Sequence, residues 1–91
     1  MNAKKIWWLI RSGSRNVEFD DLVKVTQAFG FVHSRTTGSH HIFGHSKVPG
    51  MLNLQRDGHQ AKPYQIRQFV KLVEKYGLSL ITKGERDAED E

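Results

Sequence analysis

The chain has 91 residues, no cysteine and a formal net charge of +4, with 14 Lys and Arg against 10 Asp and Glu. A chain of this length makes one domain with a modest core, and without cysteine it has no disulfide and no thiolate zinc site, so a cytoplasmic location is expected. The longest apolar run, residues 6–10, is far too short to cross a bilayer and shorter than the usual apolar stretch of a secretory signal.

The net charge understates how basic the folded part is. Residues 1–84 contain 13 Lys and Arg against 5 Asp and Glu, a balance of +8, because acidic residues crowd the end of the chain. A surface of this kind favours an anionic partner, foremost a nucleic acid. A merely solvated, soluble surface explains the composition equally well.

Two helices are predicted in the first third of the chain. Residues 4–10 predict a short helix, in which the adjacent Trp7 and Trp8 cannot share one face, so at least one should be partly exposed. Residues 18–29 carry apolar side chains at helical spacing, acidic residues in the first turn and Gly30 at the end.

Three strands are predicted next. Residues 31–35 and 39–43 have the composition of a hairpin joined by a turn at residues 36–38. Residues 44–50 predict a loop with a type II turn at Val48-Pro49-Gly50, and residues 51–55 predict the third strand.

A last helix is predicted from Pro63 to the glycine at position 77, after a polar loop. Its core-facing stripe consists of Ile66, Phe69, Val70, Val73 and Tyr76. The order helix, strand, strand, strand, helix predicts an α+β domain in which two helices cover one face of a three-stranded antiparallel sheet.

The tetrad Gly38-Ser39-His40-His41 is the strongest candidate for chemistry. Cleavage of RNA without a metal needs a group that exchanges protons near neutral pH, and an imidazole titrates at about 6.5. His40 and His41 must face opposite sides of a strand. Alternation does not decide which of them shares the buried face, since either Ile42 or Phe43 qualifies as the buried residue.

Cations and further histidines surround this tetrad in the sequence. Arg35, Lys47, Arg56 and Lys62 fall in or beside the loops at the ends of the sheet, where long cationic side chains reach phosphates. His33, His45 and His59 raise the question of a metal site, but their spacing matches no standard site, so we expect neither a metal nor another cofactor.

Several segments together resemble the HicA toxin family. They are Phe19-Asp20-Asp21-Leu22 leading to Gly30-Phe31, the run from Arg35 to Phe43, Leu52-Asn53-Leu54-Gln55, and the helix from Pro63 to Leu78. The resemblance implies a fold similar to double-stranded RNA-binding domains. It divides the chain into an N-terminal extension (1–16), a HicA-like domain (17–82) and an acidic tail (83–91) that should be disordered.

The resemblance also implies a function. HicA proteins are toxins that cleave messenger RNA until a HicB antitoxin neutralises them, and the family's catalytic histidine maps onto His40. Gly38 and Ser39 would then hold the turn and contact phosphate, while no metal takes part. The N-terminal tryptophans, Ser46 where proline is frequent, and the acidic tail depart from the common pattern, which bears on substrate choice and antitoxin docking.

Two rival functions stay open at this point. The first is an RNA-binding module of the same fold without catalysis, in which the histidines contact phosphate or 2′-hydroxyl groups. The second is an interaction protein whose basic face docks an acidic partner. Substitution of His40 separates catalysis from binding, because it should abolish cleavage and leave binding largely intact.

Overall fold

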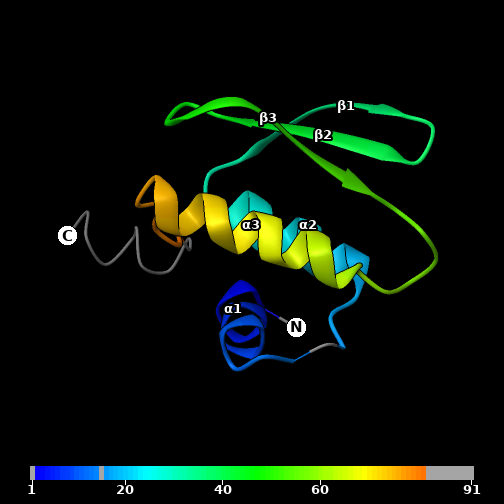
Figure 1. Cartoon of the computed structure of the whole chain (residues 1–91), viewed down its shortest axis with the longest axis vertical. Coiled ribbons are helices and arrows are strands. Elements are labelled where there is room, and N and C mark those ends of the chain that lie inside the picture. The colour runs from blue at the N-terminus through cyan, green and yellow to red at the C-terminus, as the bar shows by residue number, and fades with distance from the viewer. Residues whose placement is uncertain (1, 15, 82–91) are drawn as a thin grey trace.

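The computed structural model describes residues 2–14 and 16–81 of the chain, with three helices and one antiparallel sheet (Figure 1). The predicted tail at 83–91 lies outside the described residues. The elements are α1 (Ala3–Arg11), α2 (Phe19–Ala28), β1 (Val32–Thr37), β2 (His40–His45), β3 (Val48–Gln55) and α3 (Pro63–Lys75).

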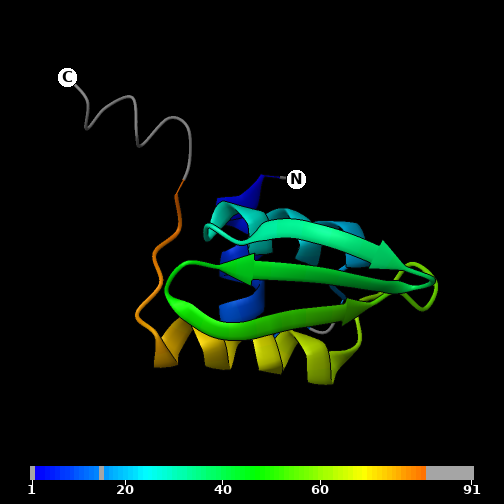
Figure 2. The same ribbon diagram turned by 90° about the horizontal axis from the view of Figure 1, so that it is seen from above.

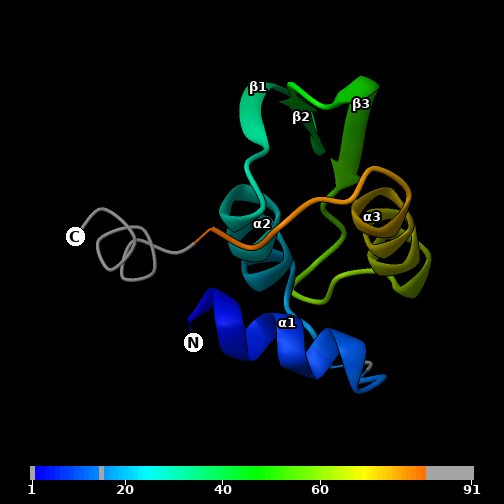
Figure 3. The ribbon, with the colours of Figure 1, turned by 90° about the vertical axis from the view of Figure 1, so that its left-hand side faces the viewer.

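The elements form three layers. The sheet has the order β1-β2-β3, with both neighbouring pairs antiparallel. Helices α2 and α3 lie side by side under one face of the sheet, and α1 packs beneath those two helices (Figure 3). The opposite face of the sheet is uncovered, as the view from above shows (Figure 2). The predicted α+β fold and its helix-covered face are therefore confirmed.

Three aromatic side chains join α1 to the layer of α2 and α3. The ring of Trp7 meets Phe29 of the α2 C-cap edge-on at 4.7 Å and Phe69 of α3 at 6.0 Å, measured between ring centroids. Ile6 and Ile10 of α1 are also buried in the core. Trp8, on the other side of α1, is 64% exposed, as expected for adjacent tryptophans.

The core is continuous from α1 to the sheet. Phe19, Phe43 and Phe69 are fully buried, so α2, β2 and α3 each contribute one phenylalanine. The residues that complete the core are Ile6, Ile10, Val17, Leu22, Val25, Phe29, Phe31, Val48, Leu52, Leu54, Ala61, Ile66, Val73 and Leu78.

The predicted extent of the loop at 44–50 is wrong, although Gly50 has φ +79°, the positive value that the predicted turn requires. Strand β2 continues to His45 and β3 begins at Val48, which leaves Ser46 and Lys47 as the connection. Val48 is buried and pairs with His45, so it belongs to the sheet. Proline and glycine at 49 and 50 are tolerated because they lie at a register shift between the Phe43–Leu52 and His45–Val48 pairs, on an edge strand.

The remaining differences are small. The hairpin strands each run two residues beyond the prediction at their C-terminal ends, and the turn shortens to residues 38 and 39. Within the described residues, no helix has the length and apolar character needed to cross a membrane.

Candidate functional site

The turn between β1 and β2 consists of two residues, Gly38 and Ser39. Gly38 has φ +59°, while Ser39 has a negative φ, the pattern of a type II′ hairpin turn with glycine first. The backbone N–H of Arg56 donates to the Ser39 carbonyl at 2.8 Å. The end of β3 therefore anchors the turn that leads into His40.

The register of β2 decides which histidine faces outward. Phe43 is fully buried against the helices, and it pairs with Leu52 of β3, which is also buried. By alternation, His41 shares the helix-covered side with Phe43, whereas His40 and Ile42 lie on the uncovered side. His40 is exposed, opposite Thr37 of β1 and Gln55 of β3.

One side chain on the uncovered face contacts the His40 ring directly. Asn53 of β3 places its Oδ1 3.1 Å from His40 Nδ1. The other ring nitrogen, Nε2, has no hydrogen-bond partner among the described residues. The ring is thus tethered at one nitrogen and accessible at the other.

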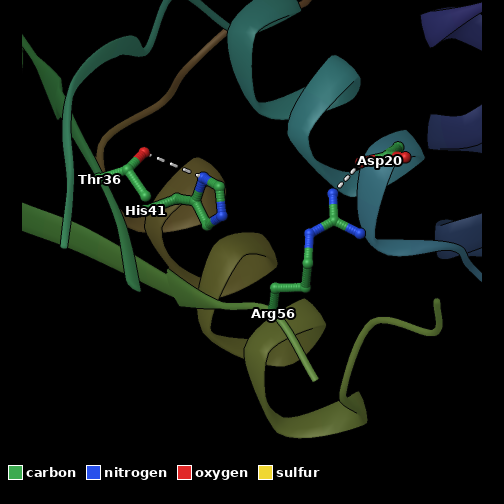
Figure 4. A network of polar contacts seen from close by, with 4 residues as sticks. All are labelled: Asp20, Thr36, His41 and Arg56. Atoms are coloured by element: carbon green, nitrogen blue, oxygen red, sulfur yellow. Dashed lines mark hydrogen bonds and ion pairs between the residues drawn. The ribbon is translucent and has the colours of Figure 1, made fainter. Parts of the chain in front are cut away.

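His41 lies in different surroundings on the helix side. Its Nδ1 is 3.4 Å from Thr36 Oγ1 (Figure 4). That hydroxyl in turn lies 2.8 Å from His33 Nε2, and the His41 ring centroid is 5.2 Å from that of Phe19. Partial burial lowers the pKa of His41, the positive charges of Arg56 and His33 lower it further, and Asp20 opposes them. The neutral imidazole is therefore favoured at position 41.

The four predicted phosphate-binding cations are not brought together. Arg35 pairs with Ile42, so it lies on the uncovered face, diagonal to His40. Arg56 forms an ion pair with Asp20 (Figure 4). Its guanidinium also stacks over the Phe19 ring, 4.6 Å from the ring centroid.

The two lysines are placed differently. Lys62 Nζ lies 3.2 Å from Asp57 Oδ2, just before α3. Lys47 sits in the β2–β3 turn, at the opposite end of β2 from His40. Arg35 is the cation of the four that lies on the His40 face without a carboxylate partner among the described residues.

His45 forms two hydrogen bonds within the fold. Its Nε2 is 3.0 Å from the Phe29 carbonyl and its Nδ1 accepts from the Lys47 N–H at 3.0 Å, so it ties the β2–β3 turn to the end of α2. In the part of the chain that the structure describes, no group of three or more His, Cys, Asp or Glu residues is arranged to hold a metal ion.

Asn53 is the residue that sequence reasoning missed at this site. Its neighbours Leu52 and Leu54 are buried, and that alternation places Asn53 on the uncovered face. The contact with His40 depends on the pairing of β2 with β3, which the sequence of one strand does not contain.

The region that carries this geometry matches a known family. A family model described as the HicA toxin of bacterial toxin-antitoxin systems matches residues 19–74, more than half of the chain. The chain belongs to the HicA toxin family. Searches of curated proteins and of solved structures found no match.

The HicA match runs from the first residue of α2 to near the end of α3 and includes the whole sheet. The predicted resemblance is confirmed over these elements. Membership implies that the chain is a ribonuclease-type toxin of a toxin-antitoxin system. It also implies RNA as the class of substrate and an antitoxin as the partner. Helix α1 precedes the matched region and packs on it through Ile6 and Ile10.

Proposed function

We propose that this protein is a metal-independent endoribonuclease that cleaves messenger RNA in the cytoplasm, with His40 as the proton-transfer group. The observation that carries the proposal is the position of His40, exposed on the uncovered sheet face with one ring nitrogen tethered and the other accessible. An imidazole in that setting reaches a sugar-phosphate backbone without entering a cavity.

Neighbouring groups on the same face support binding of RNA. Arg35 supplies a positive charge diagonal to His40, at a distance of about 7–8 Å for side chains so related. Gly38 and Ser39 hold the turn, and the exposed Ser39 hydroxyl is a donor for a phosphate oxygen. Lys47, Arg56 and Lys62 act in this proposal as peripheral contributors to the positive field, because two of them already pair with carboxylates.

A HicB-like antitoxin is the proposed inhibitor. The uncovered face also carries exposed apolar side chains near Gly44, towards the other end of β2 from His40, with Val32 69% and Met51 56% exposed. An uncovered sheet face of this kind, with apolar groups and one reactive side chain, suits a protein partner that excludes RNA by covering it.

The test is incubation of the purified, antitoxin-free protein with RNA in the presence of a chelator, beside a His40→Ala variant. Loss of a general acid or base lowers a rate by a factor of about 10²–10⁴, so we expect near-complete loss of cleavage with RNA binding retained. His59→Ala, at an exposed position away from the uncovered face, is the matched control and should cleave normally.

Two results contradict the proposal. If the unmodified protein leaves RNA intact, the chain is an RNA-binding module or an interaction protein. If His40→Ala cleaves as well as the unmodified protein, the catalytic group lies elsewhere.

A further inference from the structure

The contact between His40 and Asn53 favours protonation of one particular nitrogen of the imidazole. Asn53 Oδ1, 3.1 Å from His40 Nδ1, is a carbonyl oxygen and can only accept a hydrogen bond. Nδ1 therefore donates, and in the neutral ring the lone pair resides on Nε2. That nitrogen faces away from its tether and has no partner among the described residues.

Asn53 is held so that it keeps this contact. It lies between Leu52 and Leu54, which are 1% and 0% exposed, and its backbone pairs with Ile42 of β2. Because both leucines are fixed in the core, the Asn53 side chain must project from the uncovered face beside the His40 ring. The two residues are adjacent through strand pairing although 13 positions separate them.

We infer that Asn53 is a positioning residue that holds His40 in the Nδ1–H form, so that Nε2 acts as a general base toward a ribose 2′-hydroxyl. This inference rests on the proposed ribonuclease function and narrows it. The opposite tautomer would present an N–H at Nε2 and could not accept a proton there.

Cleavage of the phosphodiester bond by the 2′-hydroxyl then needs no cofactor. Nε2 takes the 2′-hydroxyl proton, O2′ forms a bond to phosphorus, and the bond from phosphorus to O5′ breaks. Water protonates the leaving O5′. The products are a 2′,3′-cyclic phosphate end and a 5′-hydroxyl end, and the proton on the imidazolium returns to solvent.

His41 provides an internal contrast. Its Nδ1 is directed at the Thr36 hydroxyl on the helix side, and its ring packs against Phe19. Among described residues flanking His40, those on its face are Thr37 and Arg35 of β1 and Asn53 and Gln55 of β3. Arg35 is the charged one of these four, so no carboxylate there competes with Asn53 for the His40 N–H.

The experiment compares Asn53→Leu and Asn53→Asp with the unmodified protein, and Asn16→Leu, at an exposed loop position, serves as the matched control. The loss of one hydrogen bond corresponds to about a tenfold change, so Asn53→Leu should lower kcat about tenfold and leave KM within about twofold. Asn53→Asp should restore kcat and move the acid limb of the pH profile of kcat/KM to higher pH, because a carboxylate stabilises the imidazolium.

Nitrogen NMR of the His40 ring tests the tautomer without any substrate. The unmodified protein should show Nδ1 protonated at a pH where the ring is neutral, and Asn53→Leu should shift the population toward Nε2–H. A ring protonated at Nε2 in the unmodified protein, or Asn53→Leu with full kcat, overturns the inference. Intact RNA with the unmodified protein overturns the ribonuclease function itself, and the NMR result distinguishes that failure from a wrong tautomer.

Discussion

His40 and His41 are adjacent in the chain but face opposite sides of the sheet. His40 meets solvent and Asn53, whereas His41 meets Thr36 and the ring of Phe19. The half-buried position of His41 lowers its pKa, and Arg56 and His33 add to that effect against Asp20. This residue therefore links the folding stability of the protein to pH.

The sign of that linkage follows from the direction of the shift. When the folded-state pKa of a histidine is below its unfolded value of about 6.5, the unfolded chain binds more protons, and stability rises with pH. The stability that neutral His41 contributes is fully present above a pH of about 6.5 and is lost as the pH falls below the unfolded-state pKa and through the lower folded-state pKa. We expect the midpoint urea concentration of unfolding to decrease when the pH is lowered from 7.5 to 5. In His41→Gln this decrease should be smaller.

The control for this measurement is His59→Gln, because His59 is exposed and its side chain has no contact with the His41 group. It should keep the pH dependence of the unmodified protein. Equal slopes for His41→Gln and the unmodified protein would show that the surroundings of His41 do not favour its neutral form.

For single residues, the sequence predicts which side chains are candidates for function better than it predicts which side chains they contact. It singles out His40, and it shows that His40 and His41 must diverge, but it leaves the buried side open because Ile42 and Phe43 are both apolar. Burial of Phe43 decides this. The pairing of Arg56 with Asp20 joins residues 36 positions apart, and such contacts follow from the fold.

Among the helices and strands, too, the sequence predicts local features better than pairings between distant segments. Helix α2 and helix α3 are predicted to within about two residues, since helical spacing is a local signal. The start of β3 is missed, because Pro49 and Gly50 favour a turn by themselves. Gly50 keeps the positive φ of a turn, but Val48 still pairs with His45, so the local preference persists as a register shift within an edge strand.

Helix α1 offers a paired test of packing. Trp7 lies edge-on to Phe29 and Phe69, while Trp8 is 64% exposed. Since Trp7 is half-buried, Trp7→Ala should destabilise the protein by about 2–3 kcal/mol, somewhat below the range for a fully buried tryptophan. Trp8→Ala should change stability by less than about 0.5 kcal/mol.

Chemical denaturation of the two variants measures this difference, and each serves as the control of the other. If both variants unfold at the same denaturant concentration as the unmodified protein, α1 does not stabilise the layers above it. A large effect of Trp8→Ala would instead place that side chain in a contact that the structure does not contain.

Charge acts at the scale of the whole molecule. The chain carries +4 in all, and residues 82–91 contribute two cations and five carboxylates, so deleting them raises the formal charge to +7. Proteins that contact nucleic-acid phosphates release counterions, and their affinity falls as salt rises. For single-stranded RNA and two or three phosphate contacts, affinity should fall roughly tenfold between 50 and 200 mM salt.

The salt dependence of RNA affinity is best measured with the His40→Ala variant, which should keep RNA intact during titration. Deleting residues 82–91 should tighten binding, because less negative charge opposes the phosphates, and the gain should shrink at high salt, where the Debye length is about 8 Å or less. An affinity that does not respond to salt would exclude phosphate contacts. Weaker binding after the deletion would mean that this segment, with its Lys83 and Arg86, contributes contacts to RNA that outweigh its carboxylates.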